Sequence, residues 1–204
     1  MDQKTQSLVK ASALAARPEL HTKLVAHVTE LHHNSIVDRT ALYECFLQTY
    51  LFAGFPAALE ALKTLSRAWP DVSHLDPNQI AQDAAQLSQQ YQDRGTLLYE
   101  RIYSRNAEIV RTEMLRLSPE LAAWAVVDGY GKTLSRPGLD MITRELCIVA
   151  LLTQLGWHRQ LFSHLMGARN VGGTLSDLRE ACSIGALGDS EKFSVAEKLI
   201  DRIS

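Results

Sequence analysis

Residues 139–168 read LDMITRELCIVALLTQLGWHRQLFSHLMGA, and this stretch decides the fold. An almost continuous apolar segment ends at Gly156, and Leu161, Leu165 and Ala168 then recur at the spacing of one helix face. Glycine takes the left-handed conformation that ends a helix at little cost. The stretch therefore predicts two antiparallel helices joined at Gly156.

The rest of the chain also predicts helices rather than strands. Its 204 residues include only 11 glycines and 6 prolines, and no segment alternates apolar and polar residues as a half-buried strand does. Ser118 before Pro119, and Thr174 or Ser176 further on, are typical of helix starts, because their hydroxyl oxygens can cap free backbone N–H groups. The sequence predicts an all-α protein.

The composition excludes several classes of protein. A net charge of −2, from 21 basic and 23 acidic side chains, argues against nucleic acid or an anionic membrane as the main partner. The longest apolar run, over 146–152, is too short to cross a bilayer, and the first residues do not form a signal peptide. Three scattered cysteines fit no disulfide framework or metal motif, so we expect a cytoplasmic protein without metal or other cofactors.

Two parts of the chain resemble each other weakly. An offset of 137 residues aligns His27 with His164, and amphipathic helices follow in the same order in both parts. We interpret residues 1–68 and 111–204 as two degenerate copies of one helical unit, joined by a polar helical connector over 69–110. The alternative is two unrelated helical hairpins that share leucines because amphipathic helices do.

His164 is the strongest candidate for a catalytic side chain. It lies among the apolar positions of its predicted helix, where a buried imidazole needs a hydrogen-bond partner. Glu145, in the preceding apolar helix, needs a partner too, and antiparallel packing would bring the two together. A carboxylate that orients a histidine prepares it as a general acid or base. The alternatives are a salt-bridged core pair, or an Arg144–Glu145 pair on a helix surface.

Four further residues are candidates for binding a small-molecule substrate beside this pair. They are polar or aromatic side chains, of which the aromatic ones could equally be packing anchors. The histidines lack the spacing of metal ligands, and no phosphate loop, nucleophile elbow or dinucleotide motif is present. The four candidates are Tyr50, Arg136, Trp157 and Gln160.

Several short motifs occur together in this chain. Those in the second half are LSPEL (117–121), SRPGLD (135–140), TREL (143–146), LxxH (161–164) and GAxNVG (167–172). A further motif, YxxAGFPAALxAL, lies at residues 50–62, in the first half. Together they resemble the carboxymuconolactone decarboxylase family and its alkyl hydroperoxidase D relatives. The resemblance implies an alkyl hydroperoxidase D-like helical bundle that forms a homo-oligomer, here with two copies of the unit in tandem.

The resemblance also implies a chemistry. Hydroperoxidase members use a Cys-x-x-Cys pair before the histidine, but Trp157 and Gln160 occupy these positions here, which argues against that activity. Glu145 matches a glutamate of the same relay. Decarboxylase members lack the cysteines, so the resemblance implies cofactor-free decarboxylation or proton transfer on a small carboxylated or lactone-like molecule. His164 would then be the acid or base, and Arg136 would bind the substrate carboxylate.

Each predicted copy keeps what the other lacks. The second copy has Glu145 and His164, whereas an offset of 137 puts Leu8 in the place of Glu145 in the first. We therefore expect one composite pocket per chain, formed between the copies or between subunits, with Tyr50 from the first copy. A non-catalytic binding or assembly protein is the alternative, and peroxide reduction by Cys147 is a weaker one.

Overall fold

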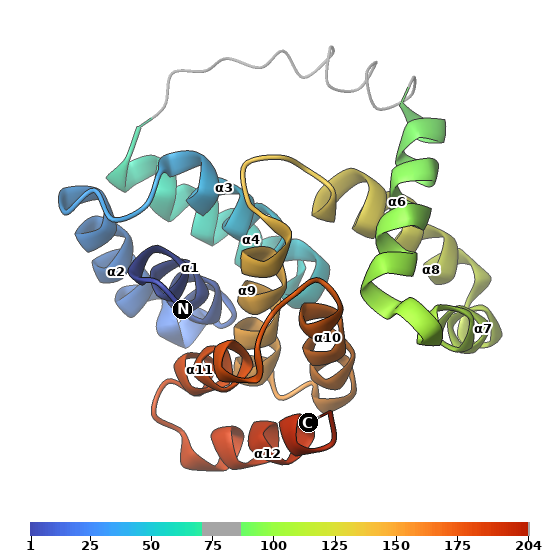
Figure 1. Ribbon diagram of the computed structural model, residues 1–204. Coiled ribbons are helices and arrows are strands. Elements are labelled where there is room, and N and C mark those ends of the chain that lie inside the picture. The colour runs from blue at the N-terminus through green and yellow to red at the C-terminus, as the bar shows by residue number, and fades with distance from the viewer. Residues whose placement is uncertain (71–86, 204) are drawn as a thin grey trace. The chain divides into compact units, whose positions relative to one another are not determined.

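The computed structural model describes residues 1–70 and 87–203, and every regular element in them is helical (Figure 1). The predicted all-α fold is therefore confirmed. The chain divides into two compact units, of which the first contains residues 1–70 and 137–204 and the second residues 71–136. The first unit therefore contains residues from both predicted copies, and the second contains most of the predicted connector together with residues 111–136 of the predicted second copy. Residues 71–86, part of the predicted connector, lie outside the described residues.

The first unit contains two sets of helices. Helix α9, from the second set, is central because it packs against α1, α10 and α11, and its residues 143–154 are all buried. Figure 1 shows it running between the two sets. This burial on all sides explains why its sequence is apolar almost throughout. The first set is α1 (Gln3–Ala15), η1 (Pro18–Leu20), α2 (His21–His33), α3 (Arg39–Leu47) and α4 (Tyr50–Ala68), and the second is α9 (Met141–Leu155), α10 (His158–Asn170), α11 (Leu175–Ala186) and α12 (Ser190–Asp201).

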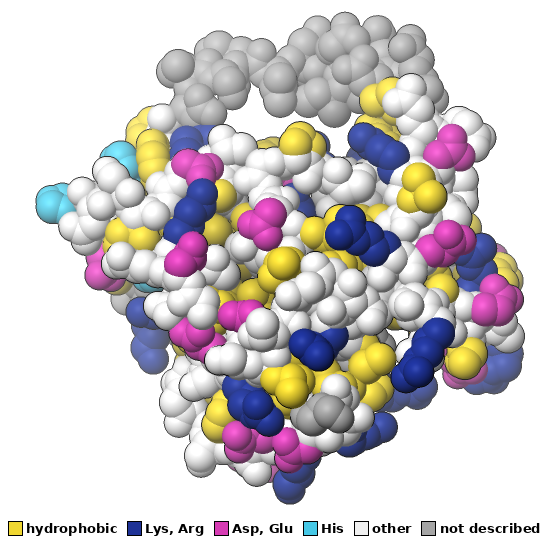
Figure 2. All heavy atoms as spheres, viewed as in Figure 1, with side chains coloured by type: hydrophobic (Ala, Val, Ile, Leu, Met, Phe, Trp, Pro, Cys, Tyr) yellow, Lys and Arg dark blue, Asp and Glu magenta, His cyan; other side chains and the backbone are white. Residues whose placement is uncertain are grey.

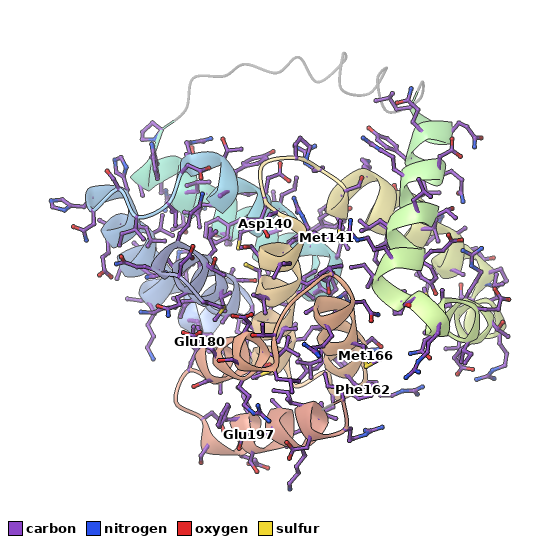
Figure 3. All side chains as sticks on the ribbon, in the orientation of Figure 1. Asp140, Met141, Phe162, Met166, Glu180 and Glu197 are labelled. Carbon is purple, nitrogen blue, oxygen red and sulfur yellow. The ribbon has the colours of Figure 1, made fainter. Side chains whose placement is uncertain are left out.

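Side-chain caps and a left-handed glycine set the ends of these helices. Asp140, labelled in Figure 3, starts α9 by accepting a hydrogen bond from the backbone N–H of Thr143 at 2.9 Å. Gly156 ends the same helix with φ 77°, as the sequence predicts. Thr174 and Asp177 then form a capping box at the start of α11. The predicted helical pair joined at Gly156 is confirmed.

The second unit is a smaller helical cluster. Ser118 caps α8 by accepting from the backbone N–H of Leu121, as predicted. The main contact joins α6 to η3, a π-helical segment. A side chain at Gly95 would lie 2.0 Å from the carbonyl oxygen of Val126, so the two backbones can approach only because Gly95 has none. The elements are α6 (Ser88–Tyr103), η2 (Ser104–Asn106), α7 (Ala107–Leu117), α8 (Pro119–Trp124) and η3 (Ala125–Leu134).

The surface carries charges of both signs. On the face shown in Figure 2, Lys and Arg side chains alternate with Asp and Glu, in keeping with the net charge of −2. Within residues 1–70 and 87–203, no helix is long and apolar enough to cross a membrane.

Candidate functional site

The predicted contact between His164 and Glu145 is present in the first unit. The imidazole Nδ1 of His164 lies 2.9 Å from Oε2 of Glu145, and the two side chains are 7% and 3% exposed. The carboxylate oxygen accepts this bond and Nδ1–H donates it, which leaves Nε2 as the nitrogen that can exchange a proton. The fold thus holds one imidazole in a single orientation.

Phe52 of α4 packs against the same imidazole. The two rings meet edge to face, with their centroids 5.2 Å apart and an angle of 86° between the planes. Sequence reasoning missed this residue, although it lies inside the 50–62 motif. Among the described residues, Nδ1 of His27 is the fully buried side-chain polar atom that makes no hydrogen bond. The side chain of His164 as a whole is 7% exposed.

Two predicted substrate-binding residues lie near the start of α10. Trp157 is 59% exposed just before the helix, and Gln160 is exposed within its first turn. Gln160 shares a helix face with His164, because residues four apart are neighbours on a helix. Phe162 and Met166 project from the side of α10 away from α9 (Figure 3). The exposed first turn of α10 thus lies directly beside the buried imidazole.

The other two predicted binding residues, Tyr50 and Arg136, come from other parts of the chain than α9 and α10. Tyr50 begins α4, and its ring lies 5.1 Å from that of Phe55. Arg136 is exposed and is the last residue of the second unit. Their predicted roles in substrate binding stay predictions.

A second buried ion pair lies next to Glu145 in sequence. Arg144 Nη2 is 3.4 Å from Glu44 Oε2, with both side chains at most 4% exposed, and Gln48 Oε1 accepts from Nη1 at 3.1 Å. Burial lowers the pKa of Arg144, while the Glu44 carboxylate acts to raise it. The alternative of an Arg144–Glu145 pair on a helix surface is wrong, because both residues are buried and have other partners.

The cysteines are poorly suited to nucleophilic chemistry. Cys45, Cys147 and Cys182 are free and buried. Burial raises the pKa of Cys147 well above its ordinary value and that of Cys182 to about 12. A thiol that stays protonated is a weak nucleophile. Across residues 1–70 and 87–203, no group of three His, Cys, Asp or Glu side chains could hold a metal ion.

His27 occupies a comparable position in the first set of helices but has a different partner. Its Nε2 lies 3.0 Å from the carbonyl oxygen of Ser7, whereas its buried Nδ1 has no hydrogen-bond partner among the described residues. Burial lowers the pKa of His27, and Lys10 adds to the effect while the Ser7 carbonyl and Glu30 oppose it. The fold therefore favours the neutral imidazole.

We expect His27 to make the protein less stable in mild acid. A histidine with a lowered pKa in the folded state takes up its proton more readily when unfolded, so stability is full above about pH 6.5 and falls as the pH drops below it. Urea denaturation of wild type and His27→Gln between pH 5 and 8 should show a weaker pH dependence in the variant. Equal pH dependence would contradict this assignment.

A pocket of about 440 Å³ opens beside the first set of helices. It lies between the end of α1, the start of α2 and the middle of α4, and neither His164 nor Glu145 lines it. Arg17, His21 and Glu60 are its polar lining residues, and the others are alanine, leucine and proline. Sequence reasoning missed this pocket, because its residues come from two separated stretches, 14–24 and 53–61, and only the second lies in a recognised motif.

The fold and the site define an all-helical protein with a buried carboxylate–histidine pair. Residues 120–193, which contain both members of the pair, match the model of the carboxymuconolactone decarboxylase family. The resemblance seen in the sequence is thus confirmed over these residues, which are similar to that family.

A curated relative gives a second comparison. The chain is similar to Peroxisomal protein 2 of Schizosaccharomyces pombe (strain 972 / ATCC 24843), with 28% identity over 144 residues. The match covers 70% of this chain and 66% of the relative, so it spans slightly less than two thirds of the relative's length.

Proposed function

We propose that this carboxymuconolactone decarboxylase-like protein is a cofactor-free lyase that uses His164 as a general acid or base. The observation that carries the proposal is the buried 2.9 Å contact between Nδ1 of His164 and Oε2 of Glu145. A positioned acid or base of this kind contributes about 10²–10⁴-fold to a reaction rate. The substrate class is a small carboxylated or lactone-like molecule.

The chemistry follows from the orientation of the imidazole. In a decarboxylation the bond to the carboxyl carbon breaks, CO₂ leaves, and the electron pair that remains must be protonated at carbon. His164 would deliver that proton from Nε2 and regain one from solvent, while Glu145 stabilises the imidazolium formed in the cycle. Gln160 and Trp157, exposed at the start of α10, would contact the substrate, with Tyr50 as a further binding residue.

A non-catalytic role is the second candidate, and the burial of the pair favours it. Side chains only 7% and 3% exposed could serve the core rather than a substrate. Substitution of either residue would then lower stability without changing any activity, because it would leave a buried partner unpaired. Peroxide reduction by Cys147 is disfavoured, since burial raises the pKa of that thiol.

We also propose that the first unit is built from two tandem copies. Each set contains four α-helices in succession, α1 to α4 and α9 to α12. The first helix of each set begins with an aspartate cap, Asp2 on α1 and Asp140 on α9. Counted from these caps, Ser7 rather than Leu8 stands opposite Glu145. Ser7 is also the residue that His27 contacts, which supports one functional pair per chain.

Crosswise contacts between the two sets give further support to the tandem arrangement. In the second set Arg144 pairs with Glu44 of the first, and at the corresponding positions Gln6 of the first set pairs with Glu180 of the second at 2.5 Å. Two related copies packed about a twofold axis produce such reciprocal contacts. We further propose a homo-oligomer in the cytoplasm, in which the exposed Leu117, Leu121 and Trp124 of the second unit would be covered.

A substrate screen tests the proposed function. Purified protein should release CO₂ from at least one member of a panel of γ-lactone acids and β-keto acids without added metal or cofactor. Glu30→Gln is the matched control for a substitution of Glu145. It changes an exposed carboxylate on α2 and should leave the rate of CO₂ release unchanged. No CO₂ release from any member of the panel would contradict decarboxylation and favour the non-catalytic candidate.

A further inference from the structure

The pocket beside α4 has an apolar interior with a few polar side chains. Its walls come from the last residues of α1, the first turns of α2 and the α4 segment around Ala57. Leu14 and Leu24 contribute the largest apolar side chains. A volume of about 440 Å³ falls within the ~300–1,000 Å³ typical of small-molecule sites.

Arg17 is the cation of this pocket, and the protein fixes its position. Its Nε and Nη2 donate to the carbonyl oxygens of Gln154 and Leu155 at 3.2 Å, where α9 ends and its carbonyls lack helical partners. Nη1 makes only a 3.9 Å contact with Glu19, which is 63% exposed. Ion pairs exposed in this way contribute little to stability, so Glu19 holds the guanidinium only weakly. The guanidinium is thus anchored before any ligand arrives and keeps N–H groups to donate.

Two further polar side chains line the pocket. His21 is half-buried, and its imidazole makes no hydrogen bond to any residue in the described ranges, so both ring nitrogens are available to a ligand. Glu60 is 56% exposed in its side chain and lies 3.6 Å from Lys63, which offsets part of its negative charge. An anchored cation and an unused imidazole at an apolar pocket match a ligand with one acidic group and an apolar body.

We propose that this pocket binds a small monocarboxylic acid whose body is a medium-length alkyl chain or a single ring. The carboxylate accepts hydrogen bonds from Arg17 and His21, and the apolar body fills the space between Leu14, Leu24 and Ala57. Neither member of the His164–Glu145 pair lines the pocket. This binding site is therefore independent of the proposed lyase reaction.

Calorimetric titration with octanoate and with octan-1-ol tests the site. The two probes share an alkyl chain and differ in the charged group, so their comparison isolates the contribution of Arg17 and His21. Octanoate should bind at one site with a Kd about tenfold lower than octan-1-ol, the ratio expected for one charge-assisted hydrogen bond. Arg17→Gln should remove most of this preference by weakening octanoate alone, because only His21 then remains to bind the carboxylate.

Three more variants separate this site from general effects on folding. Ala57→Trp fills the pocket from α4 and should abolish binding of both probes, whereas Glu60→Gln removes a like charge and should tighten octanoate by about threefold. His164→Gln should change neither Kd, because His164 lies outside the pocket. Unchanged Kd values in His164→Gln would show that the octanoate site does not depend on His164. The failure of one proposal would then leave the other untouched.

Several outcomes would overturn the proposal. Absence of saturable octanoate binding up to its micelle concentration would do so, as would equal Kd values for octanoate and octan-1-ol. Octanoate binding that survives Ala57→Trp would place the ligand elsewhere. Because Glu60 is exposed, Glu60→Gln should fold normally, and unchanged octanoate affinity in that variant would show that the ligand charge does not lie in this pocket.

Discussion

Glu44→Ala should lower the free energy of unfolding by roughly 3–5 kcal/mol, because it leaves Arg144 charged and buried without its carboxylate partner. Burial already lowers the pKa of Arg144 against the opposing effect of Glu44, which reflects the cost of holding this guanidinium away from water. Such a loss is a large part of the ~5–15 kcal/mol that stabilises a typical domain. Urea denaturation followed by circular dichroism measures it.

The control for this prediction is an exposed ion pair in the same unit. Lys63 and Glu60 are 53% and 56% exposed, so Lys63→Ala should cost no more than about 1 kcal/mol. The double variant Glu44→Leu with Arg144→Met should recover much of the lost stability, since apolar residues of similar size can replace a buried pair. A cost below about 1 kcal/mol for Glu44→Ala would contradict the role given to this pair.

Glu145→Gln should lower kcat by about 10²–10⁴-fold on whichever substrate the protein decarboxylates, with a smaller effect on KM. A glutamine can still hydrogen-bond Nδ1 of His164, but it carries no charge and so cannot stabilise the imidazolium that delivers the proton from Nε2. Steady-state kinetics of CO₂ release measures both constants.

A matched variant separates orientation of the imidazole from substrate contact. Gln160 lies one turn before His164 and is exposed, so Gln160→Ala should raise KM more than it lowers kcat. Near-ultraviolet circular dichroism should show that both variants keep the wild-type packing. A Glu145→Gln protein with wild-type kcat would mean that the carboxylate does not orient a catalytic histidine.

The sequence predicted the parts of the structure that depend on local chemistry. The left-handed turn at Gly156, the caps at Ser118 and Thr174, and the buried His164–Glu145 contact all follow from helix spacing and from the needs of polar groups in an apolar segment. Such features can be read from a few neighbouring residues.

Contacts between distant segments could not be predicted in the same way. Phe52 against His164, and Glu44 against Arg144, join residues about a hundred positions apart, so no spacing within one helix indicates them. The pocket at Arg17 depends on carbonyl groups at the end of α9, which a sequence pattern does not reveal. The division into units was also hidden, because the contact between α6 and η3 relies on close backbone approach at Gly95.

The central claim is that Nε2 of His164 carries a proton to or from the substrate, and solvent deuterium incorporation tests it most directly. In D₂O, wild-type protein should convert its best substrate to a product with one deuterium on the carbon that lost CO₂, as seen by proton NMR. His164→Gln should slow this reaction by about 10²–10⁴-fold while keeping the fold. Deuterated product formed by His164→Gln at the wild-type rate would contradict the claim.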